Sequence, residues 1–545
     1  MNWKDIKNRK LAEQRSLLEP YLVSEDKISP IADQNDIGDL IDKSSFITPN
    51  QKKITNLEIT ELLSHYQNAT LSVKEVVTAF CFRATLAHQL VNCLTEVRFS
   101  EALQEAEQLD EYFRTNGKLR GPLHGIVVSL KDNINVAGLA SSMGFIGTSI
   151  EKKNEDAAMA TAIKRLGGII IAKTNTSPGM MYSETTNMLW GRTLNPWSRK
   201  LLNVGGSSGG EGAIAALKGS NFGIGSDIGG SVRHPAGLNL VYGLKPSSGR
   251  FPKHGTVSGQ AGQESIVSVY GVISNSLANV EYVTKTIIGS SPYYDLDPSC
   301  IPLEYRKFEV DQNAKLNIGI LTSDGTTTST SPVIRGLGIV KHKLLEKGHN
   351  IIDWKDTYFT EIKDTIYPFY GANGYAGIKK LIEQSGEPLD PHLKYVEDGK
   401  DMAVSELWEL HKKRTELAKK YLDFWNGKED CERLDAIISS VTPFPGCLID
   451  KIVPQPVNAI WNALDYSSIT VPVTRCDVSK DKPIDKKNYY ISEVDKFVHE
   501  TYARETEKFH GGPVSVQVIC NKLEEEKCLA IARYLNDLLH ENDQK

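Results

Sequence analysis

Residues 205–235 read GGSSGGEGAIAALKGSNFGIGSDIGGSVRHP, and the prediction of the fold starts from this stretch. Ten of the 26 residues from 205 to 230 are glycine, and serines stand near both ends of the stretch. Glycine permits positive φ and lets the backbone approach another group closely. The pair Gly229–Gly230 directly before Ser231 could therefore turn main-chain N–H groups toward one point, as in an oxyanion hole beside a serine nucleophile. The alternative is a glycine-rich surface loop without chemistry.

A serine nucleophile needs a base, and the segment GPLHGIVVSLKDN at 121–133 offers one. Its apolar run 126–130 follows Gly125 and predicts a buried strand that ends at Lys131. Burial penalises the charged ammonium group and lowers its pKa, which would make Lys131 a usable proton acceptor. The alternative is a lysine whose head reaches solvent and pairs with Asp132.

These two segments belong to a longer series of motifs that resembles the amidase signature hydrolases. The other central motifs are KTNTSPGMMYSETTN at 173–187, GRTLNPW at 191–197 and YGLKPSSGR at 242–250. Later motifs have counterparts in fungal acetamidases: GQES at 262–265, LDAIISSVTPF at 434–444, WNALDYSSITVPV at 461–473 and GGPVSVQVI at 511–519. The resemblance covers nearly the whole chain, from about Ile54 to the last helix-like segment.

The resemblance implies an α/β amidase-signature fold, in which helices cover both faces of a central mixed β-sheet. We expect an N-terminal helical arm at 1–53 and a single amidase domain at 54–545. Within that domain, the signature core spans about 120–290, and a helical segment at about 291–430 shapes the cleft. Alternating strand-like and helix-like periodicity agrees with this class. The predicted helices are 72–90, 102–113, 157–166, 333–346, 405–424 and 524–539. The predicted strands are 126–130, 168–172, 318–321, 434–439, 469–473 and 514–519.

The same resemblance implies a serine–serine–lysine triad. Lys131 corresponds to the base, Ser207 to the bridging serine and Ser231 to the nucleophile that becomes acylated. The family binds the oxyanion through four consecutive backbone N–H groups and lines the substrate site with the main chain of a methionine. The implied substrate-binding positions are Met180, Ser207, Ile228, Gly229, Gly230 and Ser231.

The implied function is hydrolysis of a small aliphatic monocarboxylic amide, such as acetamide, to carboxylate and ammonia through an acyl-enzyme. Eight cysteines stand without CxxC or Cys–His pairs at metal spacing, so we predict no metal, cofactor or disulfide framework. The alternatives are a fatty-acyl amide hydrolase and a non-catalytic binding protein that keeps the fold.

Two other catalytic or binding motifs fit the glycine-rich stretch less completely. The GxSxG pattern at 205–209 fits the nucleophile elbow of α/β-hydrolases, but no HGGG-type motif precedes it. GGSSGG also lacks the lysine of a nucleotide-binding P-loop. Around the site, we expect Glu211 to cap the following helix and Ser208 to support the proton relay. We expect Arg233 to form a structural ion pair and His234 to pack in the interior.

The composition is typical of an enzyme that acts on small molecules. The 545 residues are 40% hydrophobic and 24% charged, with a formal net charge of −5, which gives no electrostatic case for binding nucleic acid or anionic membranes. The first residues carry no apolar core of a secretory signal, and the apolar runs are too short to span a bilayer. We therefore expect a cytoplasmic enzyme that binds a small-molecule amide. A homodimer is one alternative for its assembly.

Overall fold

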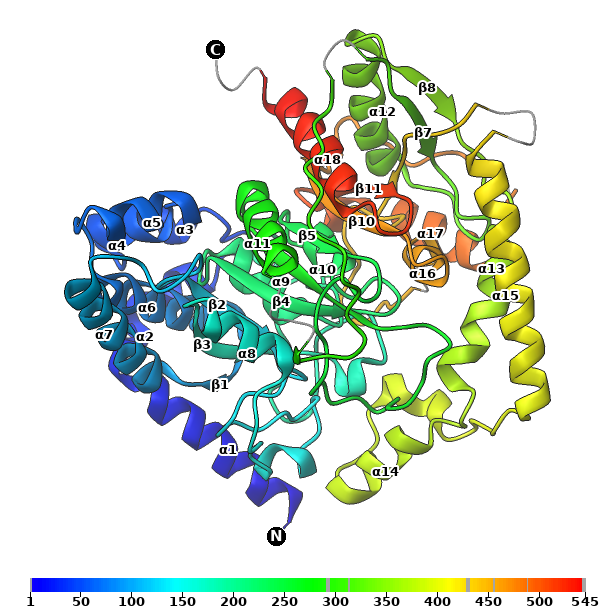
Figure 1. The fold of residues 1–545 in the computed structure, drawn as a ribbon. Coiled ribbons are helices and arrows are strands. Elements are labelled where there is room, and N and C mark those ends of the chain that lie inside the picture. The colour runs from blue at the N-terminus through cyan, green and yellow to red at the C-terminus, as the bar shows by residue number, and fades with distance from the viewer. Residues whose placement is uncertain are drawn as a thin grey trace.

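A mixed β-sheet runs through the molecule in the computed structural model (Figure 1). The structure describes residues 2–290, 295–311, 314–427, 432–453, 456–487 and 489–541, so parts of the predicted cleft-shaping segment, at 291–294, 312–313 and 428–430, lie outside the described residues. The described strands form one sheet in the order β1-β3-β2-β4-β6-β5-β10-β11-β9-β7-β8. Their bounds are β1 Leu94–Val97, β2 Val127–Lys131, β3 Ile169–Thr174, β4 Phe222–Asp227, β5 Tyr242–Lys245, β6 Val269–Ser274, β7 Asn317–Leu321, β8 Asn350–Asp353, β9 Ala436–Ser440, β10 Ser467–Arg475 and β11 Pro513–Cys520.

The strand pairing is parallel in two regions, antiparallel between them, and antiparallel again between β1 and β3 at one edge of the sheet. Strand β2 runs parallel to both β3 and β4, and β7 runs parallel to both β8 and β9. The pairs from β4 through β6, β5, β10 and β11 to β9 are antiparallel. Every residue of β2 and β4 is buried, so both faces of these central strands are covered, because successive side chains point to opposite faces.

Helices cover the sheet along its length. Their bounds are α1 Trp3–Leu18, α2 Glu25–Ala32, α3 Leu40–Lys43, α4 Pro49–Thr55, α5 Ile59–Gln67, α6 Val73–Val91, α7 Phe99–Asn116, α8 Ala158–Arg165, α9 Gly209–Ala216, α10 Arg233–Leu238, α11 Leu277–Gly289, α12 Ser331–Glu346, α13 Phe359–Ile366, α14 Ala376–Ser385, α15 Val404–Trp425, α16 Pro456–Ala463, α17 Glu493–Arg504 and α18 Glu525–His540. Short 3-10 helices η3 Pro178–Met180, η5 Tyr367–Gly371 and η6 Pro391–Val396 lie near the site. All six predicted helices and all six predicted strands are present, with bounds that differ by a few residues, and the α/β fold class is confirmed.

The N-terminal helices pack against the sheet region. Lys10 of α1 pairs with Glu96 of β1 at 2.8 Å, and Leu18 and Ile28 belong to the main hydrophobic core. The division into an N-terminal arm and a single domain stays a prediction. Helices α13 and α15 lie together at one side of the molecule, and α14 lies apart from them at its lower edge (Figure 1). Within the described residues, no helix has the length and apolar character needed to cross a bilayer.

Candidate active site

The site forms where the parallel strands β2 and β4 end. Lys131 is the last residue of β2, and Asp227 is the last residue of the neighbouring β4. The carboxyl ends of parallel neighbours meet at the same edge of a sheet, which is where α/β folds place their ligand sites. Ser207 lies just before α9, and Ser231 just before α10. A hydrogen bond of 3.2 Å from the Ser208 N–H to the Ser231 carbonyl joins the two serine segments.

Lys131 is fully buried and contacts the first serine directly. Its Nζ donates to Ser207 Oγ at 2.7 Å and to Ser226 Oγ at 2.9 Å. Burial lowers the pKa of Lys131 to about 7, although nearby carboxylates, with Asp227 the largest, act in the opposite direction. The solvent-facing alternative for Lys131 is therefore wrong. The carboxylate of Asp132 instead accepts hydrogen bonds from three other groups, those of Thr95, Ser142 and the Met143 backbone.

The loop before Ser231 is held from inside by Asp227. Its carboxylate forms a buried ion pair with Arg233 at 2.9 Å and accepts hydrogen bonds from the backbone N–H groups of Gly230, at 2.8 Å, and Val232, at 3.1 Å. These contacts, led by Arg233, hold the pKa of Asp227 well below its usual range against the effect of burial. The ion pair matches the role expected for Arg233.

One of the four backbone N–H groups that the family resemblance implies as oxyanion donors is thus already used. The Gly230 N–H points to Asp227, whereas those of Ile228, Gly229 and Ser231 have no acceptor among the residues that the structure describes. Gly230 has φ +122°, and a Cβ there would lie 2.6 Å from the Cβ of Asn458. This position therefore requires glycine, since a larger residue would be strained and would displace Asn458.

Glu211, close to Lys131, differs from expectation. Glu211 lies in the first turn of α9, but its buried carboxylate accepts hydrogen bonds from Ser129 Oγ at 2.6 Å and Thr174 Oγ1 at 2.7 Å, with no N-cap bond. Burial raises its pKa to about 7. The hydroxyl of Ser208 donates to the Ser226 carbonyl at 3.4 Å, and Lys131 Nζ lies 3.5 Å from the same carbonyl, so the supporting role of Ser208 stays a prediction.

Sequence reasoning missed Ser226 as a partner of Lys131. Ser226 is the next-to-last residue of β4, and β4 lies beside β2, whose last residue is Lys131. Finding it required the order of the strands, which the motifs do not state.

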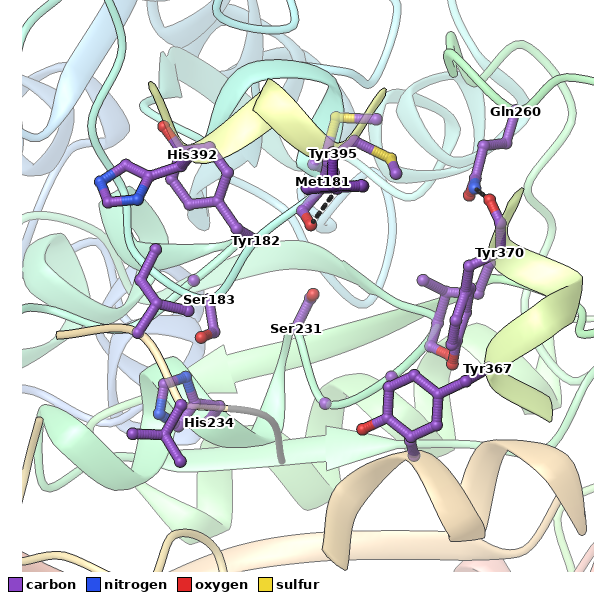
Figure 2. A pocket seen from close by; sticks show the side chains of 18 of the residues that line it. Met181, Tyr182, Ser183, Ser231, His234, Gln260, Tyr367, Tyr370, His392 and Tyr395 are labelled. Carbon is purple, nitrogen blue, oxygen red and sulfur yellow. Dashed lines mark hydrogen bonds between the residues drawn. The ribbon is translucent and has the colours of Figure 1, made fainter. Parts of the chain in front are cut away.

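Two cavities meet at Ser231. The tyrosine cavity has a volume of about 630 Å³, and its tyrosines are Tyr182, Tyr367, Tyr370, Tyr375 and Tyr395. The polar cavity has a volume of about 660 Å³, and its polar residues include Asn133, Ser207, Ser226, Lys253, His254 and Asp297. The residues that line both cavities are Met180, Ile228, Ser231 and Gln260. Figure 2 shows Ser231 in the tyrosine cavity, between Tyr182 and His392 on one side and Tyr367 and Tyr370 on the other. The structure thus brings the predicted positions together around Ser231.

His234 lines the tyrosine cavity and is also packed in the interior. It is 2% exposed, and its Nε2 lies 4.0 Å from Cys447 Sγ. Burial lowers the pKa of His234 to about 4, which keeps the imidazole neutral in the physiological range.

One cluster in the described chain has the residue types of a metal site. The ligand atoms of Glu184, His392 and Asp450 lie within 4.8 Å of one another. Arg192 forms ion pairs with both carboxylates, at 2.6 Å for Asp450. The single positive charge of this guanidinium offsets one of the two negative charges that the cluster could offer to a metal cation.

Comparisons with known proteins agree on one family. The amidase family model matches residues 75–529. An acetamidase of Emericella nidulans is 36% identical over 99% of this chain and 98% of that protein. An acetamidase of Aspergillus oryzae is 36% identical over 99% of each chain. Among solved structures, a fatty acid amide hydrolase has a TM-score of 0.92 at 30% identity, covering 98% of this chain and 96% of the other.

Proposed function

Since the chain belongs to the amidase family and is an amide hydrolase, we propose that it converts small aliphatic monocarboxylic amides, acetamide among them, to the carboxylate and ammonia. The reaction uses Ser231 as nucleophile, Ser207 as proton bridge and Lys131 as base. The relatives of highest identity given above are named acetamidases and match the chain end to end, which supports the short acyl group.

The first half of the reaction acylates the enzyme. Neutral Lys131 takes a proton from Ser207, which takes one from Ser231 as the Ser231 oxygen attacks the amide carbon. The proton then returns through Ser207 to the amide nitrogen, the carbon–nitrogen bond breaks, and ammonia leaves. An amide nitrogen is a poor leaving group until it is protonated, so the relay must work in both directions.

The second half uses water. A water molecule gives a proton to the same relay, attacks the acyl carbon and releases the carboxylate, which restores the Ser231 hydroxyl. In both halves, the negative oxygen of the tetrahedral intermediate is held by the backbone N–H groups of Ile228, Gly229 and Ser231. Removing one such donor typically costs roughly 2.7–4 kcal/mol of activation free energy.

One observation carries this proposal: Lys131 Nζ lies 2.7 Å from Ser207 Oγ in a fully buried position. An ordinary lysine is protonated at neutral pH and cannot accept a proton, but burial lowers the pKa of Lys131 to about 7. The lowered pKa allows Lys131 to act as the base. Near Ser231 in the sequence, the other candidate base is the buried His234.

The test is ammonia release from acetamide by the wild-type protein and by Ser231→Ala. We expect turnover by the wild type and none by the variant, with unchanged folding by circular dichroism. Ammonia release by Ser231→Ala at the wild-type rate would exclude Ser231 as the nucleophile. If the wild type released no ammonia from any amide, the proposed reaction would be refuted.

A second candidate is the hydrolysis of longer acyl amides, favoured by the likeness to a fatty acid amide hydrolase. Each methylene buried in an apolar pocket contributes about 0.8 kcal/mol, so kcat/KM along a series reports how far the pocket extends. A decline from butanamide to octanamide and oleamide supports the small-amide function, and a steady rise supports the longer chain. A cytoplasmic location, a homodimer and the lack of a metal or cofactor stay predictions.

A further inference from the structure

The tyrosine cavity is larger and more aromatic than acetamide requires. Cavities of about 630 Å³ fall in the range that binds drug-sized ligands, so acetamide would leave most of it empty. Among the described residues that line it, none is Asp, Glu, Lys or Arg. Its ionisable side chains besides the tyrosines are those of His234 and His392, so a charged acyl group would lose its hydration without a carboxylate, ammonium or guanidinium in the described lining to replace it, which favours neutral groups.

Hydrogen bonds anchor three of the five rings. The hydroxyl of Tyr395 donates to the Met181 carbonyl at 3.2 Å (Figure 2). That of Tyr370 donates to the Ile228 carbonyl at 2.9 Å. The hydroxyl of Tyr182 donates to a backbone carbonyl at 2.8 Å. Because these hydroxyls are occupied, the rings are held in place and offer their faces and edges to a ligand.

The rings also stand edge to face. Tyr367 and Tyr370 have centroids 5.9 Å apart at 75°, and Tyr375 and Tyr395 have centroids 5.3 Å apart at 78°. Edge-to-face and offset contacts are the arrangements that aromatic pairs prefer. A planar aromatic group entering between these pairs would meet ring faces and ring edges, whereas a saturated ring of the same carbon count would gain only the burial of its surface.

The relay determines which part of the substrate enters this cavity. In the proposed reaction, Ser207 returns a proton to the amide nitrogen, so the nitrogen must face Ser207. Ser207 lines the polar cavity and is absent from the described lining of the tyrosine cavity. The acyl group, attached to the opposite side of the carbonyl carbon, therefore points from Ser231 into the tyrosine cavity, and ammonia departs on the side of the polar cavity.

We propose that the tyrosine cavity receives an aromatic acyl group, so that neutral arylalkyl carboxamides are better substrates than aliphatic amides of the same size. This inference rests on the proposed function and names the substrate class of the same site. The chemistry is unchanged: the bond from Ser231 Oγ to the acyl carbon forms, the carbon–nitrogen bond breaks, and the proton from Ser231 reaches the nitrogen through Ser207.

The test compares phenylacetamide with cyclohexylacetamide, which have the same carbon skeleton, with acetamide as the reference for the reaction itself. We expect the kcat/KM of phenylacetamide to exceed that of cyclohexylacetamide by roughly two- to tenfold, because aromatic contacts add to burial by about that factor. This wild-type ratio needs no variant. A ratio of one or less while acetamide is still hydrolysed would overturn the inference and leave the proposed function intact, whereas no hydrolysis of any of the three would end the proposed function.

A substitution locates the effect. Tyr395→Leu removes one wall of the cavity, and we expect it to bring the ratio of phenylacetamide to cyclohexylacetamide close to one. The matched control is Tyr489→Leu, since Tyr489 is 73% exposed and lines neither cavity. The control should keep the wild-type ratio. An unchanged ratio in Tyr395→Leu, and also in the double variant with Tyr375→Leu, would show that these rings do not contact the acyl group.

Discussion

Raising the pH should activate this enzyme through the deprotonation of Lys131. Burial disfavours the ammonium form and lowers the pKa of Lys131 to about 7, so the neutral base is present at lower pH than in an exposed lysine. Roughly a tenth of Lys131 is neutral at pH 6 and roughly nine tenths at pH 8. With an unshifted pKa near 10.5, well under a hundredth would be neutral at pH 8.

The assay is kcat/KM for acetamide between about pH 5 and pH 9, from initial rates of ammonia release. We expect a rise of about tenfold per pH unit below pH 7 and a plateau above it. Lys131→Arg should be inactive throughout, because a guanidinium stays protonated at any usable pH. A profile flat from pH 6 to pH 8, or an active Lys131→Arg enzyme, would refute lysine as the proton acceptor.

The ionisation of Glu211 should change the shape of this pH profile. Burial raises its pKa to about 7, and its carboxylate raises the pKa of Lys131, so both groups titrate in the same range. As Glu211 ionises with rising pH, it opposes the loss of the proton from Lys131 and broadens the rise. Glu211→Gln removes that charge, and we expect its rise to be sharper and to lie at lower pH than in the wild type. A shift to higher pH would contradict the sign of this interaction.

Three further predictions concern the loop and the serines. A fluorophosphonate should label the peptide that contains Ser231 and leave Ser207 unlabelled, as mass spectrometry can determine; label on Ser207 would favour the α/β-hydrolase elbow. Gly230→Ala should lower the free energy of unfolding by roughly 1–3 kcal/mol, from its φ of +122° and the clash with Asn458, and an unchanged Tm in calorimetry would contradict this. Tyr370→Phe should lower kcat about fivefold with an intact fold, since it loses a hydrogen bond to the oxyanion loop worth about 1 kcal/mol; an unchanged kcat would show that the hydroxyl does not hold the loop.

The parts of the site that depend only on residues adjacent in the chain could be predicted from the sequence. An apolar run that ends in Lys131 predicts a buried base because a short continuous apolar segment forms a buried strand. The glycines around 229 and 230 mark a loop that only small residues can form. Both are properties of a few consecutive residues, and the structure has the strand and the loop as expected. The roles of the serines came from the family resemblance and stay proposals.

Other parts could not be predicted because they depend on which distant segments become neighbours. Ser226 reaches Lys131 only because β4 lies beside β2, and Glu211 is buried only because α9 packs over the same strands. The use of the Gly230 N–H by Asp227 follows from the turn of the loop, which the composition of the motif does not specify. Burial and hydrogen-bond partners are thus tertiary properties, although the residue types were visible.

The wall of the tyrosine cavity and the oxyanion loop are physically joined. Tyr370 comes from η5, far along the chain from the glycine-rich stretch, and its hydroxyl holds the Ile228 carbonyl. That carbonyl and the Gly229 N–H belong to one peptide plane and point in opposite directions, so fixing one aims the other. An acyl group that displaces the Tyr370 ring would also turn a donor of the proposed oxyanion hole. Poor acyl groups should therefore lower kcat as well as raise KM, because the fit of the acyl group affects an interaction that is strongest in the transition state.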